Sequence, residues 1–269
     1  MSTTEISAKD VMALRKKTGL GMMDCKKALI EHNGDTAAAE AALREKLKGK
    51  MDDRVDRAAG EGRIVIMTEG DKASILEFRA ETDFTARNDA FIAMSDSIAS
   101  MALAQADGDV EFTDEMKAML DEVRITTGEN ISMARGTRLT GGSFGSYIHH
   151  DNKLGVLLQF EGDLPADLAT GICQHVAAYI PTPMAVDADG VPEDLVAAKA
   201  NEAKAEAENS GKPPEIAEKI AEGKMRKFFE EVTLMGQKFV RDDTKMVKEM
   251  LPDGVKLKAF ARFQLGAEA

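Results

Sequence analysis

The stretch RIVIMTEGDKASILEF (residues 63–78) alternates apolar and polar side chains on both sides of a Gly-Asp pair. A period of two predicts strands, and a Gly-Asp pair between two such runs predicts a tight turn. We therefore expect an antiparallel hairpin with strands at 64–68 and 74–79. The next segment, residues 89–104, repeats its apolar residues at intervals of three and four, which predicts a helix that backs the hairpin.

A similar pattern occurs a second time further along the chain. GSYIHHDNKLGVLLQF (145–160) predicts strand, turn and strand, and PADLATGICQHVAAYI (165–180) predicts the helix that follows. We interpret this as a weak internal repeat, a two-part core in which small antiparallel sheets are backed by helices. The first copy takes about five residues more to reach its helix, and the added segment is ETDFTARN (81–88).

The N-terminal 57 residues predict a separate unit of three short helices. Ser7 with Asp10 caps the first helix, and the third starts at a cap at Asp35 or Thr36. Residues 1–57 carry 12 basic and 10 acidic side chains, a net charge of +2, whereas the whole chain carries −12 and the remainder therefore −14. This charge asymmetry indicates a domain boundary.

Residues 192–231 consist almost entirely of helix formers, broken once by NSGKPP at 209–214. Two antiparallel helices joined by a short turn fit this pattern, and the first arm has too few large apolar residues to be buried, so the hairpin should protrude. The expected fold class is α+β. The expected domains are residues 1–57, residues 58–143 and residues 144–269, with the helical hairpin 192–231 inside the third.

Composition limits the classes of function. The 35 basic and 47 acidic residues argue against broad binding of nucleic acid or of an anionic membrane, but they are compatible with a protein partner. The chain shows no membrane span and no targeting segment, so we expect a cytoplasmic protein. Two cysteines and four histidines form no recognisable nucleophile–base pair or metal-ligand pattern, so we expect no catalytic residue, metal or cofactor.

Several residues allow two interpretations. Cys25 beside Lys26 is either a packed small residue, which we favour, or a reactive thiol. Met22 and Met23 fit a core or a contact surface equally well. The pair His149–His150 fits an exposed pair or a partner contact, and His175 fits half-buried packing or a partner contact.

The TDF segment also allows two interpretations. In the first, Thr82 or Asp83 caps a turn and Phe84 folds back on the hairpin. In the second, Phe84 protrudes as a wedge that separates packed elements of a partner, while Asp83 competes at a cation or phosphate site.

Six motifs in this chain resemble the elongation factor Ts family, the guanine-nucleotide exchange factors of bacterial elongation factor Tu. They occur in family order over nearly the whole chain: LRKKTGLGMMDCKKAL (14–29), ETDFTARN (81–88), GENI (128–131), GSYIHH (145–150), HVAA (175–178) and SGKPPEIAEKIAEGKMRKFFEEVTLMGQKFV (210–240). The resemblance implies an N-terminal three-helix module like ubiquitin-associated domains, a two-part core and a protruding antiparallel helical hairpin. These three expectations agree with the patterns above.

The resemblance also implies roles for individual residues. The partner would be elongation factor Tu, in its GDP-bound and nucleotide-free forms, and the chain would not be an enzyme because it makes and breaks no bond. The segment of Thr82, Asp83, Phe84 and Thr85 would enter the nucleotide-binding domain of that partner and disturb its magnesium site. Further partner contacts carry over to Arg15, Met22, Met23, Gly128, His149 and His175.

Some departures from the family pattern limit these expectations. Leu20 stands where the family commonly has alanine, and Thr85 stands where it has valine. The chain ends soon after FARFQLG, so a contact that some members make through a C-terminal helix should be absent. A homodimer, known for some members, stays open. The competing hypotheses are a protein-binding adaptor without exchange activity, which would not need the TDF segment, and a Cys or His hydrolase.

Overall fold

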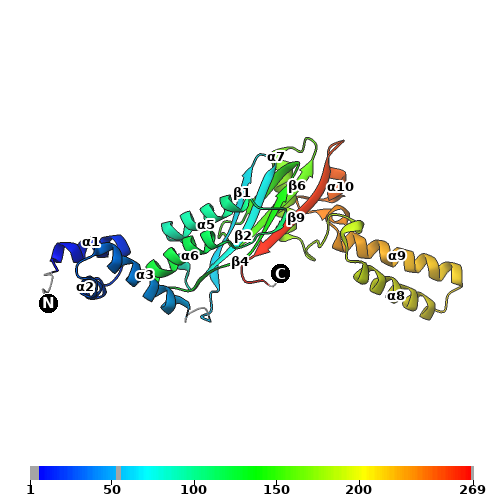
Figure 1. Cartoon of the computed structure of the whole chain (residues 1–269). Helices are drawn as coiled ribbons and strands as arrows, with labels where there is room; N and C mark the ends of the chain where they lie inside the picture. Colours follow the sequence, from blue (N-terminus) through cyan, green and yellow to red (C-terminus); the bar gives the residue numbers. More distant parts are fainter. Residues whose placement is uncertain (1–5, 53–55, 268–269) are drawn as a thin grey trace.

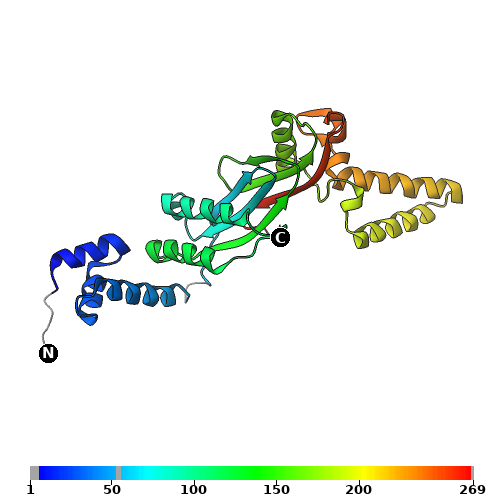
Figure 2. The same ribbon diagram turned by 45° about the horizontal axis from the view of Figure 1, so that its top comes forward.

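The computed structural model describes residues 6–52 and 56–267. A three-helix module, a β-rich core and a helical hairpin follow one another from one end of the molecule to the other (Figures 1 and 2). The fold is α+β, and the predicted module, two-part core and protruding hairpin are confirmed. Among the described residues, no helix is both long and apolar enough to cross a membrane.

The N-terminal module forms because three short helices share a small apolar core. Its helices are α1 (Ala8–Thr18), α2 (Met22–Glu31) and α3 (Thr36–Asp52). Ser7 caps α1 by accepting from the Asp10 backbone N–H, and Asp35 accepts from the first backbone N–H groups of α3. Cys25 packs in this core, fully buried, with Leu14 and Leu29, so the structural interpretation of that cysteine holds.

The first sheet has the strand order β1-β2-β4-β3 and is antiparallel throughout. Its strands are β1 (Glu61–Glu69), β2 (Lys72–Ala80), β3 (Gly108–Asp109) and β4 (Ile131–Thr140). The predicted hairpin is confirmed, whereas the ten-residue strand β4 was not predicted. Helices α5 (Asp89–Ala102) and α6 (Asp114–Thr127) cover one face of this sheet, where Phe78 and Phe91 are fully buried.

The second half of the core repeats this plan with a smaller sheet. Its strand order is β5-β6-β9, formed by β5 (Ser143–Ile148), β6 (Leu154–Glu161) and β9 (Lys256–Gln264). Helix α7 (Ala166–Ala178) covers its outer face. The remaining elements are η1 (Ala188–Gly190), η2 (Leu234–Gly236), β7 (Lys238–Phe239), β8 (Asp242–Met246) and α10 (Val247–Met250). Helix α10 was not predicted.

The two sheets pack face to face through a shared apolar cluster. Ile64 and Ile75 of the first sheet meet Leu157 and Phe263 of the second. Gly155 is required at this contact, because a Cβ atom there would lie 2.6 Å from Cγ2 of Ile64. The core therefore has four layers, helix, sheet, sheet and helix, and its two halves cannot separate without exposing this cluster to water.

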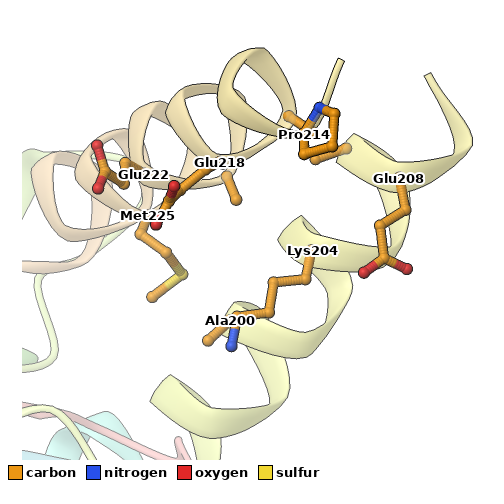
Figure 3. Close-up of a pocket in the computed structure, with 10 residues that line it drawn as sticks. Ala200, Lys204, Glu208, Pro214, Glu218, Glu222 and Met225 are labelled. Carbon is orange, nitrogen blue, oxygen red and sulfur yellow. The ribbon is translucent and has the colours of Figure 1, made fainter. Parts of the chain in front are cut away.

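The helical hairpin consists of α8 (Glu193–Asn209) and α9 (Pro214–Val232). Its buried positions are all alanines, Ala203, Ala207 and Ala217, which fits the prediction that its first arm is too polar to lie inside a core. A groove of about 450 Å³ runs between the two helices. Figure 3 shows Lys204 and Glu208 along α8, with Glu218 and Glu222 on α9.

Candidate functional site

The ETDFTARN segment forms a single turn of helix between two caps, α4 (Asp83–Ala86). Thr82 caps α4, because its Oγ1 accepts from the Thr85 backbone N–H at 3.3 Å. Asn88 then caps α5 by accepting from the Ala90 backbone N–H at 2.8 Å. The extra length of the first repeat therefore adds an ordered one-turn helix, and the predicted turn is capped by Thr82.

The ring of Phe84 points into solvent from this turn, with 83% of the residue exposed. Thr85 faces the other way and is buried, so it anchors α4 against the core. Asp83 is partly exposed and lies beside Arg87, with Oδ2 3.5 Å from Nη2. The interpretation in which Phe84 folds back on the hairpin is therefore wrong, and the protruding geometry is the one observed.

The segment around Gly128 lies against this turn. Gly128 ends α6 in the left-handed conformation, at φ 74°, and its N–H donates to the Arg124 carbonyl at 2.8 Å. The chain then places Glu129 against Thr82, whose backbone N–H and Oγ1 both donate to the carboxylate, at 3.1 and 2.6 Å. Glu129 lies within the GENI motif, but this contact was not predicted from the motif. The signal was an acid one residue after a helix-ending glycine.

His149 belongs to the same end of the core. It follows β5, and its Nδ1 lies 2.8 Å from the Tyr147 hydroxyl. The turn after it is joined to the start of β1, because Lys153 Nζ lies 2.6 Å from a carboxylate oxygen of Glu61. Glu61 pairs with Ala80, the residue from which the chain leads into α4. The structure thus brings the TDF turn, Gly128 and the His149 turn to one end of the two sheets.

The N-terminal module is attached near this end, through its third helix. Arg44 forms an ion pair with Glu122 of α6, and Lys48 lies 3.4 Å from Asp121 of the same helix. On the module surface Arg15 is exposed, and so are Met22 and Met23, at 46% and 75%. The two methionines are therefore available for contact and do not belong to the core of the module.

His175 does not join this surface, because its side chain is completely buried. Its Nδ1 accepts from the Val240 backbone N–H at 3.1 Å, and its Nε2 pairs with Oε1 of Gln237 at 2.9 Å. Burial lowers the pKa of His175 below its ordinary value, so the neutral ring is favoured. The ring is therefore not exposed for a direct partner contact in the free chain, and it ties α7 to the segment that carries β7.

The second cysteine is no better placed for nucleophilic chemistry than Cys25, and no metal site forms among the described residues. Cys173 is fully buried, and burial raises the pKa of its thiol to about 12, which leaves it protonated and unreactive at neutral pH. Within the residues that the structure describes, no three His, Cys, Asp or Glu side chains gather closely enough to hold a metal ion.

An exposed aromatic ring on a supported turn, with exposed methionines on an adjoining module, is typical of the class of proteins that bind another protein. A family model described as Elongation factor TS matches residues 81–267. Elongation factor Ts of Psychrobacter sp. (strain PRwf-1) is 39% identical over 272 residues, which cover 98% of this chain and 92% of the relative. Elongation factor Ts of Thiobacillus denitrificans (strain ATCC 25259 / T1) is 42% identical over 257 residues, covering 92% and 87%.

The chain therefore belongs to the elongation factor Ts family, the translation elongation factors of the nucleotide-exchange class. The resemblance noted in the sequence is confirmed. The matched region of the family model starts at Glu81, the first residue of the ETDFTARN segment.

Proposed function

We propose that this chain binds elongation factor Tu in the cytoplasm and accelerates the release of its GDP, so that GTP can replace it. The observation that carries the proposal is the 83% exposure of Phe84 on an ordered, capped turn. An exposed ring gains free energy when a partner buries it, and a turn that is already ordered loses little entropy on binding. Such a residue is suited to insertion between packed elements of another protein.

Asp83 supplies the second part of the proposed mechanism. In nucleotide-binding proteins of this kind, Mg²⁺ bridges phosphate oxygens and is among the largest charges in the site. A carboxylate brought close to that site competes with the phosphates and the protein oxygens for the metal. The partner of Asp83 in the free chain is the exposed Arg87, and an exposed ion pair contributes at most about 1 kcal/mol, so the carboxylate is released easily.

Phe84 and Asp83 act together in this proposal. The ring separates elements of the nucleotide-binding domain, and the acid weakens metal binding there. Both effects lower the affinity for GDP, so by reciprocity bound nucleotide lowers the affinity for this chain by the same factor. The incoming nucleotide then expels the exchange factor, and no bond is made or broken by the chain itself.

The other partner contacts that we propose surround this turn. Gly128 and His149 lie at the same end of the core, and Arg15, Met22 and Met23 lie on the module attached to it. These contacts fix the orientation of the partner and supply affinity, whereas the TDF turn supplies the change in nucleotide affinity. Both the GDP-bound and the nucleotide-free forms of elongation factor Tu are bound in this scheme.

The test uses elongation factor Tu loaded with a fluorescent GDP and chased with excess unlabelled GDP. The proposal predicts that adding this chain increases the release rate, and that the rate rises with its concentration to a plateau. A release rate that does not change, in a mixture where the two proteins still bind each other, would show a protein-binding adaptor and overturn the proposal.

A further inference from the structure

The four-residue helix that carries Phe84 needs support from outside itself. Forming a first helical turn fixes several residues for a single backbone hydrogen bond, so an isolated turn is unstable in water. Thr85 is the only buried residue of α4, and Ala86 packs partly against the core, so the apolar packing of this single turn is small. Polar contacts made by the residues at its start add to its order.

Glu129 makes the most direct of these contacts. The Thr82 hydroxyl has a single hydrogen, which it donates to Glu129 Oε1 at 2.6 Å, a length typical of a hydroxyl bound to a carboxylate. With its hydrogen committed there, the oxygen presents its lone pairs to the Thr85 backbone N–H. The second carboxylate oxygen accepts from the Thr82 backbone N–H at 3.1 Å. Glu129 therefore fixes both the backbone and the capping side chain.

The position of Glu129 is itself fixed by its neighbour in the sequence. The Asn130 backbone N–H donates to Glu81 at 2.7 Å, and the Asn130 side chain donates to the Arg57 carbonyl at 2.8 Å. Arg57 and Glu81 also form an ion pair, with 3.6 Å between Nη1 and Oε2. The two residues just before α4, Glu81 and Thr82, and the segment leading from the N-terminal module are thus tied to one short stretch after α6.

We propose that Glu129 is a positioning residue for nucleotide exchange, which holds α4 so that Phe84 projects in the orientation needed for insertion. This inference rests on the proposed function and adds to it a residue that acts through Thr82. It requires that removing Glu129 matters only because Phe84 is then misplaced. The effect of the substitution must therefore depend on the presence of the ring.

A double-mutant cycle tests that dependence. Glu129→Ala should slow stimulated GDP release roughly tenfold, the factor that corresponds to about 1.4 kcal/mol. In a Phe84→Ala background the same substitution should change the rate less than about twofold, because coupled residues are not additive. An equal loss in both backgrounds, or no loss in the first, would overturn the inference. Glu161→Ala removes an exposed carboxylate at the end of β6 in the second sheet and is the matched control.

Substitutions at Thr82 separate positioning from general damage to the fold. Thr82→Val keeps the shape but removes the hydroxyl and should lose activity as Glu129→Ala does, whereas Thr82→Ser keeps the hydroxyl and should release GDP faster than Thr82→Val. Equal activity of the Thr82→Ser and Thr82→Val variants would contradict a role for the hydroxyl. These variants leave Glu129 in place, so they also serve if Glu129→Ala does not fold.

A second readout does not depend on elongation factor Tu. The chain contains no tryptophan, so Phe84→Trp introduces a single tryptophan at the wedge, whose fluorescence can be excited selectively. Adding Glu129→Ala should lower the fluorescence anisotropy of that reporter, whereas adding Glu161→Ala should leave it unchanged. Unchanged anisotropy with Glu129→Ala would overturn the positioning role. If the unsubstituted chain does not stimulate GDP release, the proposed function fails, and this measurement still decides whether Glu129 orders the turn.

Discussion

Replacing Phe84 by alanine removes the ring that the proposed exchange mechanism depends on. Burying a phenylalanine side chain fully contributes about 1.5–3 kcal/mol. Because 83% of Phe84 is exposed in the free chain, most of this contribution is still available to a partner. A loss of about 2 kcal/mol corresponds to a roughly 30-fold smaller rate of stimulated GDP release at low concentrations of the exchange factor. Stability of the fold should change by less than about 0.5 kcal/mol, because an exposed side chain makes few contacts.

The assay is stopped-flow release of fluorescent GDP from elongation factor Tu over a range of concentrations of this chain, with thermal unfolding measured on each variant. Ile216→Ala is the matched control, since Ile216 is an exposed apolar residue of α9. The hairpin of α8 and α9 projects from the core, away from the N-terminal module (Figure 1). Phe84→Leu should keep part of the activity, because it retains apolar volume. A Phe84→Ala variant that stimulates release as fast as the unsubstituted chain would refute the reasoning.

Three further predictions concern the support of this site. Glu77 is fully buried and accepts from two arginines. Glu77→Gln should therefore lower the free energy of unfolding, measured by guanidinium titration, by about 3 kcal/mol. A loss below about 1 kcal/mol would contradict this prediction. Because the pKa of His175 is lowered in the fold, the unfolded chain binds a proton there first, and the free energy of unfolding should fall as the pH drops below about 6.5. A His175→Gln variant should lose less stability over the same pH range. An equal slope of stability against pH in both proteins would count against this role of His175. Arg44→Glu should detach the N-terminal module and increase the radius of gyration measured by X-ray scattering. Adding Glu122→Arg should reverse the increase. An unchanged radius of gyration in Arg44→Glu alone would show that the ion pair does not hold the module.

The hairpins and the longer helices could be predicted because their patterns are local, but β4 and the short helix α10 could not. The sequence of β4, ISMARGTRLT, places Gly136 between two arginines, a composition that is poor in strand formers. In the fold Arg135 pairs with the buried Glu77, and Arg138 lies 3.3 Å from Asp107. Gly136 leaves room for Leu76, which a Cβ atom would approach to 3.0 Å. These partners come from elsewhere in the chain, and no pattern within the strand indicates them.

The candidate site was predictable in its central residues and less so in their surroundings. The extra length of the first repeat indicated the TDF segment, and the family resemblance assigned it a role. The exposure of Phe84 and the burial of His175 both depend on tertiary packing, and Gln237, the partner of His175, lies 62 residues further along the chain. Glu129 is 47 residues from Thr82. A single sequence does not show which of its acidic residues contacts a residue so far away in the chain.

The central claim is that this chain releases GDP by disturbing the magnesium site of elongation factor Tu. The most direct test measures the factor by which the chain accelerates GDP release, first with Mg²⁺ present and then with the metal removed by a chelator. If the TDF turn acts through the metal, it speeds GDP release by weakening the hold of Mg²⁺ on the nucleotide. Without Mg²⁺ that hold is already absent, so the factor by which the chain accelerates GDP release should shrink by roughly tenfold or more. An acceleration of the same size with and without Mg²⁺ would contradict the claim.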